Sequence, residues 1–294
     1  MPKINVKSID IVYEAFGKGT TVFWLQSPWG GRNPGAYYVA GRLSNKYRTI
    51  IWDSPNTGQS GNIIKDTPSE WHLCCEYIYG LCKALGETSV YFVGNSGGGE
   101  MALLLAHLYP EIVKGVVMYR PSDTTTSIEK AITKARYYDL AEIAEQGTMK
   151  DVLEYSSNPP ESRWAEISRW VYKLAINPKA KDELLSYDSK KFSYIMKNWG
   201  NWMSQRGFYK ANLDDETLRT IKVPVLINPA IDPFHTEEIA KELYEKIPNA
   251  KWAPSSIIRS EREMYGAPGE EHNFGGLPDL MPHLEKFLIE NDSE

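Results

Sequence analysis

The sequence lacks the features that mark membrane, secreted and nucleic-acid-binding proteins. No apolar run approaches the roughly 18 residues that a transmembrane helix needs, and residues 1–3 lead directly into strand-like sequence without a signal-peptide core. Lys and Arg total 33 against 38 Asp and Glu, and the basic residues are scattered. The charge footprint of a nucleic-acid or anionic-membrane partner is therefore missing. We expect a cytoplasmic protein with neither kind of partner.

Cysteine is also scarce. The chain has 3 cysteines, Cys74, Cys75 and Cys82, and all of them fall in one predicted helix. An odd and local set does not make a disulfide framework, which favours a reducing compartment. A metal site there would need more ligands than His72 could add. We interpret the three thiols as small core residues.

What the sequence does have is a strand–turn–helix unit at residues 90–109. Residues 90–93 are apolar and β-favouring, and residues 100–109 are mostly strong helix formers. Between them lies a Gly-x-Ser-x-Gly pattern centred on Ser96. A serine on so sharp a turn needs small neighbours two residues away on either side, because strand and helix pass close to them. The helix N-terminus favours developing negative charge, so Ser96 is a candidate nucleophile.

Predicted strands and helices alternate on both sides of this unit. Strands are expected at residues 4–9, 11–14, 21–25, 47–52, 113–119, 223–228 and 251–254, and helices at 67–85, 236–247 and 278–290. The helix at 67–85 has a start signature, with Thr67 as N-cap and Pro68 at the first helical position, and it ends at Gly86. This alternation predicts an α/β fold with a mostly parallel central sheet and helices on both faces.

The alternation of predicted strands and helices stops between Arg120 and about Thr220, where only helical patches are found. These patches are residues 127–146, 161–176 and 181–187. We interpret 121–220 as a helical cap, or lid, inserted into a core domain made of 1–120 and 221–294. The cap is rich in aromatic residues. We expect most of them to form the cap's own core and a few to face a pocket, which would favour an apolar or aromatic substrate.

Several motifs together make the chain resemble the α/β-hydrolase family. The pattern at Ser96 resembles that family's nucleophile elbow. Residues 53–60 resemble its Asp-x-Arg-Gly-x-Gly-x-Ser turn, with Pro55 in place of Arg and Asn56 in place of Gly; we interpret this turn as structural. The late strand followed by Asp232 also matches the family. The resemblance implies a cofactor-free enzyme with acyl-transfer chemistry on a small-molecule substrate.

A serine nucleophile needs a base and an orienting acid, and the family's chain order is serine, acid, histidine. Three of the 5 histidines, His72, His107 and His283, fall in predicted helices, which leaves His235 and His272 on loops. The position of His272 just before the final helix matches the family's histidine. We therefore assign Ser96 as nucleophile, Asp232 as orienting acid and His272 as base. Asp123 is the alternative acid and His235 the alternative base.

The family's oxyanion loop usually begins with His-Gly after an early strand. Ser27 and Pro28 occupy these two positions here. The resemblance implies that the backbone N–H of Trp29 is one oxyanion donor and that of Gly97 the other. Pro28 has no N–H, but it is not the residue asked to donate.

The expected reaction is hydrolysis of an ester or lactone of a small, apolar molecule through an acyl-enzyme on Ser96. Family members with the same triad also hydrolyse carbon–carbon bonds or act as lyases, and fold and triad do not separate these reactions. A rival from another class is a hydrolase-like ligand-binding receptor with little turnover. The sequence leaves open whether the chain forms a homodimer.

Overall fold

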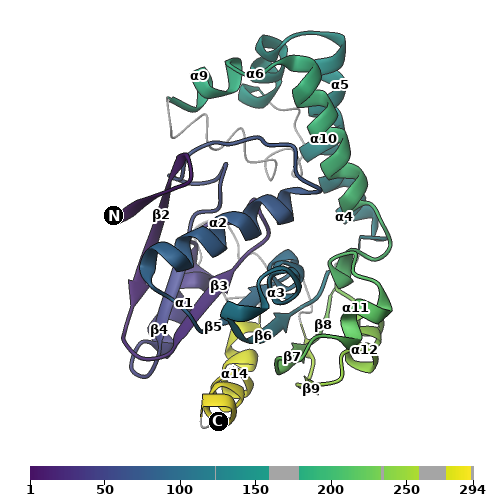
Figure 1. Ribbon diagram of the computed structural model, residues 1–294. Helices are drawn as coiled ribbons and strands as arrows, with labels where there is room; N and C mark the ends of the chain where they lie inside the picture. The colour runs from purple at the N-terminus through teal and green to yellow at the C-terminus, as the bar shows by residue number, and fades with distance from the viewer. Residues whose placement is uncertain (123, 159–178, 233–234, 258–275, 293–294) are drawn as a thin grey trace.

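A sheet of 8 strands runs through the centre of the chain, in the order β1-β2-β4-β3-β5-β6-β7-β9 (Figure 1). This computed structural model describes residues 1–122, 124–158, 179–232, 235–257 and 276–292. The strands of the sheet are β1 (Lys3–Val6), β2 (Ile9–Phe16), β3 (Thr21–Leu25), β4 (Arg48–Trp52), β5 (Val90–Asn95), β6 (Val113–Tyr119), β7 (Val225–Asn228) and β9 (Ala250–Trp252). Strands β1, β2 and β4 pair antiparallel, and all pairs from β4 to β9 are parallel. The predicted mostly parallel sheet is confirmed.

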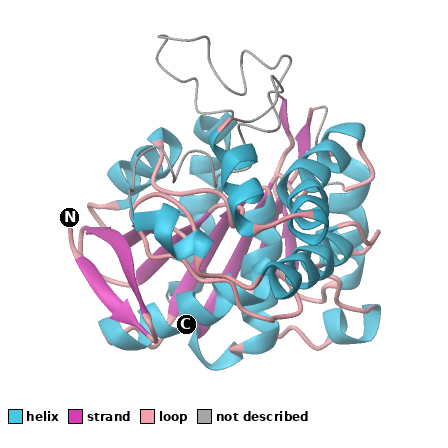
Figure 2. Cartoon of the chain, turned by 90° about the horizontal axis from the view of Figure 1, so that it is seen from above, coloured by secondary structure: helices cyan, strands magenta, loops and turns pink. Residues whose placement is uncertain are grey.

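Helices cover both faces of this sheet (Figure 2). The α-helices are α1 (Pro34–Leu43), α2 (Glu70–Leu85), α3 (Gly97–Leu108), α4 (Ser127–Thr133), α5 (Asp139–Gln146), α6 (Met149–Ser157), α9 (Lys179–Leu185), α10 (Ser189–Met203), α11 (Asp215–Arg219), α12 (Glu237–Lys246) and α14 (Leu277–Asp292). Shorter elements are η1 (Pro110–Ile112), the π-helical η2 (Lys134–Tyr138), η3 (Phe208–Lys210) and a parallel strand pair, β8 (Ala230–Ile231) with β10 (Ser256–Ile257). Among the described helices, none combines the length and the apolar character that a membrane crossing requires.

Alternating side chains of each strand separate the core into two layers. Phe23 and Leu25 of β3 belong to a hydrophobic cluster with α2 and α3, whereas Val22 and Trp24 belong to a second cluster with α1 and α14. This is the two-residue period of a strand whose faces are both buried. Helix α1 was not among the predicted elements, although Asn33 caps it and Pro34 begins it.

The helices from α4 to α11 are inserted between two neighbouring strands of the sheet. Strands β6 and β7 pair directly, with Val117 opposite Leu226, so the chain leaves the sheet after β6 and returns beside it. The described residues of this insertion form helices and no strand of the sheet, while the predicted patch at 161–176 lies outside the described residues. The domain boundaries at 120/121 and 220/221 stay a prediction.

The inserted helices pack on the core rather than forming a separate unit. Phe192, Trp199 and Trp202 of α10 belong to the same hydrophobic cluster as Trp71 of α2. Figure 1 shows α10 running from the outer helices of the insertion toward α4 and the core. The expectation that most of the aromatic residues form the cap's own core is therefore incomplete, because several of them also pack against Trp71 of α2.

Helix α2 begins two residues later than predicted. Its N-cap is Ser69, whose hydroxyl accepts a hydrogen bond from the His72 N–H, so the assignment of Thr67 as N-cap is wrong. The Thr67 hydroxyl instead donates to the Ser69 carbonyl at 2.9 Å. Gly86 ends the helix with a φ of 75°, as expected of a left-handed cap.

The three cysteines of α2 are free and buried, which confirms their interpretation as core residues. Burial raises the pKa of the Cys82 thiol to about 12, so this thiol stays protonated and unreactive at neutral pH. Within the described part of the chain, no group of three metal-ligating side chains comes together.

A buried ion pair fastens the insertion to α2. Arg136 of η2 donates from Nε to Glu70 Oε2 at 2.9 Å and from Nη2 to Glu70 Oε1 at 2.5 Å, and both side chains are only 2% exposed. The Tyr137 hydroxyl donates to the same carboxylate. The guanidinium also lies over the Trp29 ring, 5.2 Å from its centroid. Breaking such a pair leaves a buried charge without compensation.

We expect Arg136→Met to lower the free energy of unfolding by about 3–5 kcal/mol, because the Glu70 carboxylate would stay buried without its partner. Chemical denaturation measures this loss. The double variant Glu70→Leu/Arg136→Met should recover most of the stability, since it removes both charges. Equal losses in the single and double variants would show that packing, rather than the charge pair, stabilises this junction.

Candidate active site

Ser96 lies on a strained turn between β5 and α3. Its φ is 53° and its ψ is −130°, a backbone conformation that L-residues other than glycine rarely adopt. A Cβ on Gly94 would lie 2.0 Å from the Gly98 carbonyl oxygen, and a Cβ on Gly98 would lie 2.4 Å from the Leu25 oxygen. Both positions exclude any larger residue, as the pattern predicts. The strain and the close packing together project Ser96 at the carboxyl edge of the sheet.

A histidine and an aspartate complete a hydrogen-bonded chain with Ser96. His235 Nε2 lies 3.0 Å from Ser96 Oγ, and His235 Nδ1 lies 2.8 Å from each carboxylate oxygen of Asp232. The His235 backbone N–H also donates to Asp232 Oδ1 at 3.1 Å. With Nδ1 donating to the carboxylate, Nε2 can accept the serine proton, which is the arrangement that activates a serine.

This geometry brings together two of the residues assigned from the sequence, Ser96 and Asp232. The place of the base is taken by His235, the alternative of the sequence analysis. His272 and the alternative acid Asp123 lie outside the described residues, so the assignment of His272 stays a prediction. The sequence offered a signal for His235 in its loop position after a late strand. That signal did not reveal that His235 hydrogen-bonds to an aspartate only three residues earlier in the chain.

A second serine contacts the nucleophile and was missed from the sequence. Ser122 Oγ lies 2.8 Å from Ser96 Oγ, and Ser122 is 1% exposed. The Ser122 N–H donates to Glu100 Oε1 at 2.9 Å, and burial raises the pKa of Glu100 well above its usual range. No motif marks Ser122; the parallel pairing of β5 with β6 brings it to the elbow. When Ser96 donates to His235, Ser122 is placed to donate to Ser96 Oγ and to hold its rotamer.

We expect Ser122→Ala to reduce kcat/KM by about 3- to 10-fold, which corresponds to one hydrogen bond of ordinary net strength. Steady-state hydrolysis of an activated ester measures the loss. Glu100→Gln is the matched control, because it keeps a neutral acceptor for the Ser122 N–H and should stay close to the parent activity. An unchanged kcat/KM in Ser122→Ala would show that Ser122 does not position the Ser96 hydroxyl.

The imidazole of His235 is held in its neutral form. Burial lowers the pKa of His235 and the positive charge of Arg120 adds to this effect, while the hydrogen bond that His235 donates to Asp232 opposes it. Arg120 is fixed by Asn95, whose Oδ1 accepts hydrogen bonds from its Nε and Nη2 at 3.2 Å and 2.9 Å. A neutral imidazole is the form that can accept a proton.

The pH dependence of activity follows from this lowered pKa. Activity requires neutral His235, so kcat/KM should fall as the pH drops through the folded-state pKa, and the midpoint should lie below the ordinary value of 6.5. Arg120→Gln removes the nearby positive charge and should move the midpoint upward, toward 6.5. A pH–rate profile checks both. A parent midpoint above the ordinary value would contradict the burial of His235.

The loop assigned to the oxyanion hole lies beside the elbow. A Cβ on Gly97 would lie 2.5 Å from Ser27 Oγ, and the Trp29 and Trp71 rings pack edge to face with centroids 5.4 Å apart. The Trp71 indole N–H donates to the Gly97 carbonyl at 2.8 Å. Within the described part of the chain, neither the Trp29 N–H nor the Gly97 N–H donates a hydrogen bond. Their role as oxyanion donors stays a prediction.

The insertion adds aromatic side chains to this side of the elbow. The Trp71 ring contacts Trp202, with centroids 5.4 Å apart, and Phe208, with centroids 4.9 Å apart. Both partners belong to the inserted segment and are buried. An apolar wall therefore adjoins the residue that follows the nucleophile.

The turn after β4 is structural, as interpreted from the sequence. The Asp53 carboxylate accepts hydrogen bonds from the backbone N–H groups of Arg32 and Gln59, each at 3.0 Å, and pairs with the Arg32 guanidinium at 2.9 Å. Asn56 takes a φ of 66°, the left-handed conformation that it tolerates in place of glycine. Asp53 thus ties the turn to the loop after β3.

Comparison with known proteins agrees with the fold and the elbow. The model of the alpha/beta hydrolase fold family matches residues 34–251, and the chain belongs to this family. A proline iminopeptidase of Clostridium botulinum is 26% identical over 300 residues, covering 99% of this chain and 98% of that protein. The 2-hydroxy-6-oxo-6-phenylhexa-2,4-dienoate hydrolase of Comamonas testosteroni is 32% identical over 130 residues, and the match covers 40% of this chain and only 43% of that protein.

The fold is also that of solved structures. A thermophilic esterase from Thermogutta terrifontis superimposes with a TM-score of 0.59 at 17% identity, covering 99% of this chain and 98% of that one. At this identity the likeness concerns the fold alone. The family and its relatives make the chain a hydrolase, and they leave the bond it cleaves open.

Proposed function

We propose that this hydrolase cleaves an ester or lactone of a small, apolar molecule through an acyl-enzyme on Ser96. The observation that carries the proposal is the hydrogen-bonded chain from Ser96 through His235 to Asp232. An ester or lactone needs nothing beyond a nucleophile, a base and oxyanion donors. The aromatic wall of Trp71, Trp202 and Phe208 favours an apolar substrate.

The reaction begins when Ser96 passes its proton to His235 Nε2 and Ser96 Oγ bonds to the carbonyl carbon. The resulting oxyanion accepts hydrogen bonds from the backbone N–H groups of Trp29 and Gly97. The imidazolium, oriented by Asp232, then protonates the leaving alkoxide as its bond to the carbonyl carbon breaks. Water attacks the acyl-enzyme with the same histidine as base, which releases the acid and restores Ser96. For a lactone, the alcohol and the acid leave as one molecule.

A second candidate reaction is hydrolysis of a carbon–carbon bond. The relative from Comamonas testosteroni favours it, because it is 32% identical over its matched region and its name states a dienoate substrate. That region covers 43% of the relative, so this reaction is the alternative rather than the first choice. A ligand-binding receptor with little turnover is less favoured, because the Ser96 hydroxyl has hydrogen bonds to both His235 and Ser122.

A substrate panel separates these reactions. The panel consists of p-nitrophenyl acetate, dihydrocoumarin, 2-hydroxy-6-oxo-6-phenylhexa-2,4-dienoate and proline p-nitroanilide, each assayed with the parent and with Ser96→Ala as blank. We expect kcat/KM for the ester or the lactone to exceed that for the other two by at least about tenfold, or about 1.4 kcal/mol of transition-state binding. Faster cleavage of the dienoate would show that the enzyme hydrolyses a carbon–carbon bond rather than an ester or a lactone. Saturable ligand binding without turnover would favour the receptor.

A further inference from the structure

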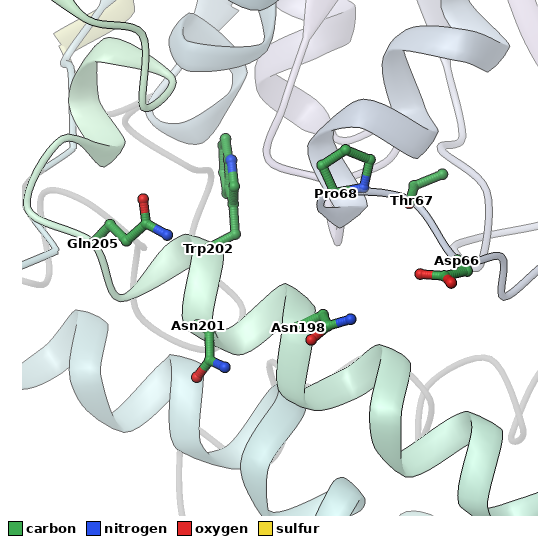
Figure 3. A pocket seen from close by; sticks show the side chains of 7 residues that line it. All are labelled: Asp66, Thr67, Pro68, Asn198, Asn201, Trp202 and Gln205. Carbon is green, nitrogen blue, oxygen red and sulfur yellow. The ribbon is translucent and has the colours of Figure 1, made fainter.

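A cavity lies between the loop that precedes α2 and the inserted helix α10 (Figure 3). It measures about 480 Å³, which is within the usual range for small-molecule sites. It is lined by Asp66, Thr67, Pro68, Asn198, Asn201, Trp202 and Gln205. None of the residues of the candidate active site, Ser96, Asp232 or His235, is part of this lining. The aromatic contacts from Trp202 to Trp71 lie next to it.

Several polar groups of this lining have no partner in the described part of the chain. The Asp66 carboxylate has no ion pair or hydrogen bond there, and the carboxamides of Asn198 and Gln205 have none either. The Trp202 indole N–H also finds no acceptor among the described residues. In Figure 3, the Asn198 amide from α10 and the Asp66 carboxylate from the opposite loop face the same space.

Other lining groups are already engaged and set the walls. The Thr67 carbonyl accepts the Trp199 indole N–H at 3.2 Å, which fixes the loop against α10. The Asn201 Oδ1 accepts the Tyr138 hydroxyl at 2.9 Å, and in Figure 3 this side chain points away from Pro68 and Thr67. The cavity thus combines a loop held against α10 with donors and acceptors on side chains that are open to a ligand.

We propose that this cavity binds a neutral polyhydroxylated small molecule, such as a monosaccharide or a disaccharide. The lining offers donors from the Trp202 N–H and the carboxamide NH2 groups, and acceptors from Asp66 and the carboxamide oxygens. A vicinal diol brings both donors and acceptors, so it can satisfy both kinds of group. The exposed Pro68 ring would pack against the C–H groups of a sugar ring.

Charged ligands match this lining less well. No Lys, Arg or His lines the cavity, so an anion would face Asp66 without a counter-charge. A cation would have only one carboxylate, and Asp66 is exposed, where an ion pair contributes little. A cation such as choline brings a single hydroxyl oxygen as acceptor, which is too few for the Trp202 N–H and the carboxamide NH2 groups together. The proposal does not rest on the reaction at Ser96, although the cavity shares Trp202 with the aromatic wall beside the elbow.

The test measures binding to the full-length chain by saturation-transfer NMR and tryptophan fluorescence. The probes are D-glucose, maltose and myo-inositol, with choline chloride and sodium acetate as charged comparisons. We expect at least one of the neutral probes to saturate with a Kd in the millimolar range, near −4 kcal/mol. Asn198→Leu should weaken this binding by about tenfold or more. Asn45→Leu, in a different surface cavity, is the matched control and should leave the Kd unchanged.

Each other outcome would overturn the proposal. Absence of saturation by all three neutral probes up to about 100 mM would exclude the polyhydroxylated class. Tighter binding of choline, lost in Asp66→Asn, would make the cavity a cation site. Sugar binding that survives both Asn198→Leu and Trp202→Phe would place the site elsewhere. Competitive inhibition of ester hydrolysis by the bound sugar would make the cavity part of the active site rather than a second site.

Discussion

Ser96→Ala is expected to reduce kcat/KM for ester hydrolysis by at least about 10⁴-fold, because no other hydroxyl at the elbow could form the acyl-enzyme. Ser122, the neighbouring hydroxyl, lies 2.8 Å away from Ser96 Oγ but has no hydrogen bond to His235. The alanine variant should fold normally, since it removes one hydroxyl and keeps the backbone of the turn. Circular dichroism and a thermal melt check the fold.

Ser204→Ala is the control for this substitution, because Ser204 is an exposed serine at the end of α10. It should keep the parent activity. A Ser96→Ala enzyme that still hydrolyses the ester at the parent rate would refute the assignment of Ser96 as the nucleophile. Activity that survives at an intermediate level would contradict the statement that no other hydroxyl at the elbow can form the acyl-enzyme.

The second large effect concerns the base. We expect His235→Gln to reduce kcat/KM by about 10⁴-fold, because His235 Nε2 is the group that accepts the Ser96 proton in the described geometry. Glutamine keeps a hydrogen-bonding group next to the buried Asp232 carboxylate and so limits the loss of stability. His272→Gln is the matched variant, and we expect it to stay within about threefold of the parent enzyme.

The two histidine variants decide whether the catalytic base is His235, which the structure places beside Ser96, or His272, which the sequence predicted. If His272→Gln loses most of its activity while His235→Gln stays active, the catalytic base is His272, as the family resemblance predicts. The acid limb of the pH–rate profile gives an independent check. If His235 is the base, the midpoint below 6.5 should disappear from the residual activity of His235→Gln and persist in His272→Gln.

Much of the sheet was predictable from the sequence because its strands are buried on both faces. Strand β3 (Thr21–Leu25) consists of Thr21 followed by four apolar residues and forms as expected. The elbow at Ser96 follows from a pattern that only a close strand–helix approach requires. Helix ends were less predictable. Thr67 and Ser69 both carry a capping hydroxyl, and only the direction of the chain before α2 decides that Ser69 caps the helix.

The site was predictable only where one residue carries a local signal. Ser96 has its motif, and Asp232 has its place after a late strand. The pairing of His235 with both depends on how the loop after β8 folds, and the contact of Ser122 with Ser96 depends on strand pairing between distant segments. The junction of Glu70 with Arg136 likewise joins α2 to the insertion, and no short-range pattern connects the two.

The most direct measurement is mass spectrometry of the enzyme after reaction with a fluorophosphonate, which phosphonylates an activated serine and releases fluoride. The account predicts one adduct per chain, on the peptide that contains Ser96, formed more slowly in His235→Gln and absent in Ser96→Ala. Unmodified Ser96 in an enzyme that hydrolyses p-nitrophenyl acetate, or an adduct on another residue, would contradict it.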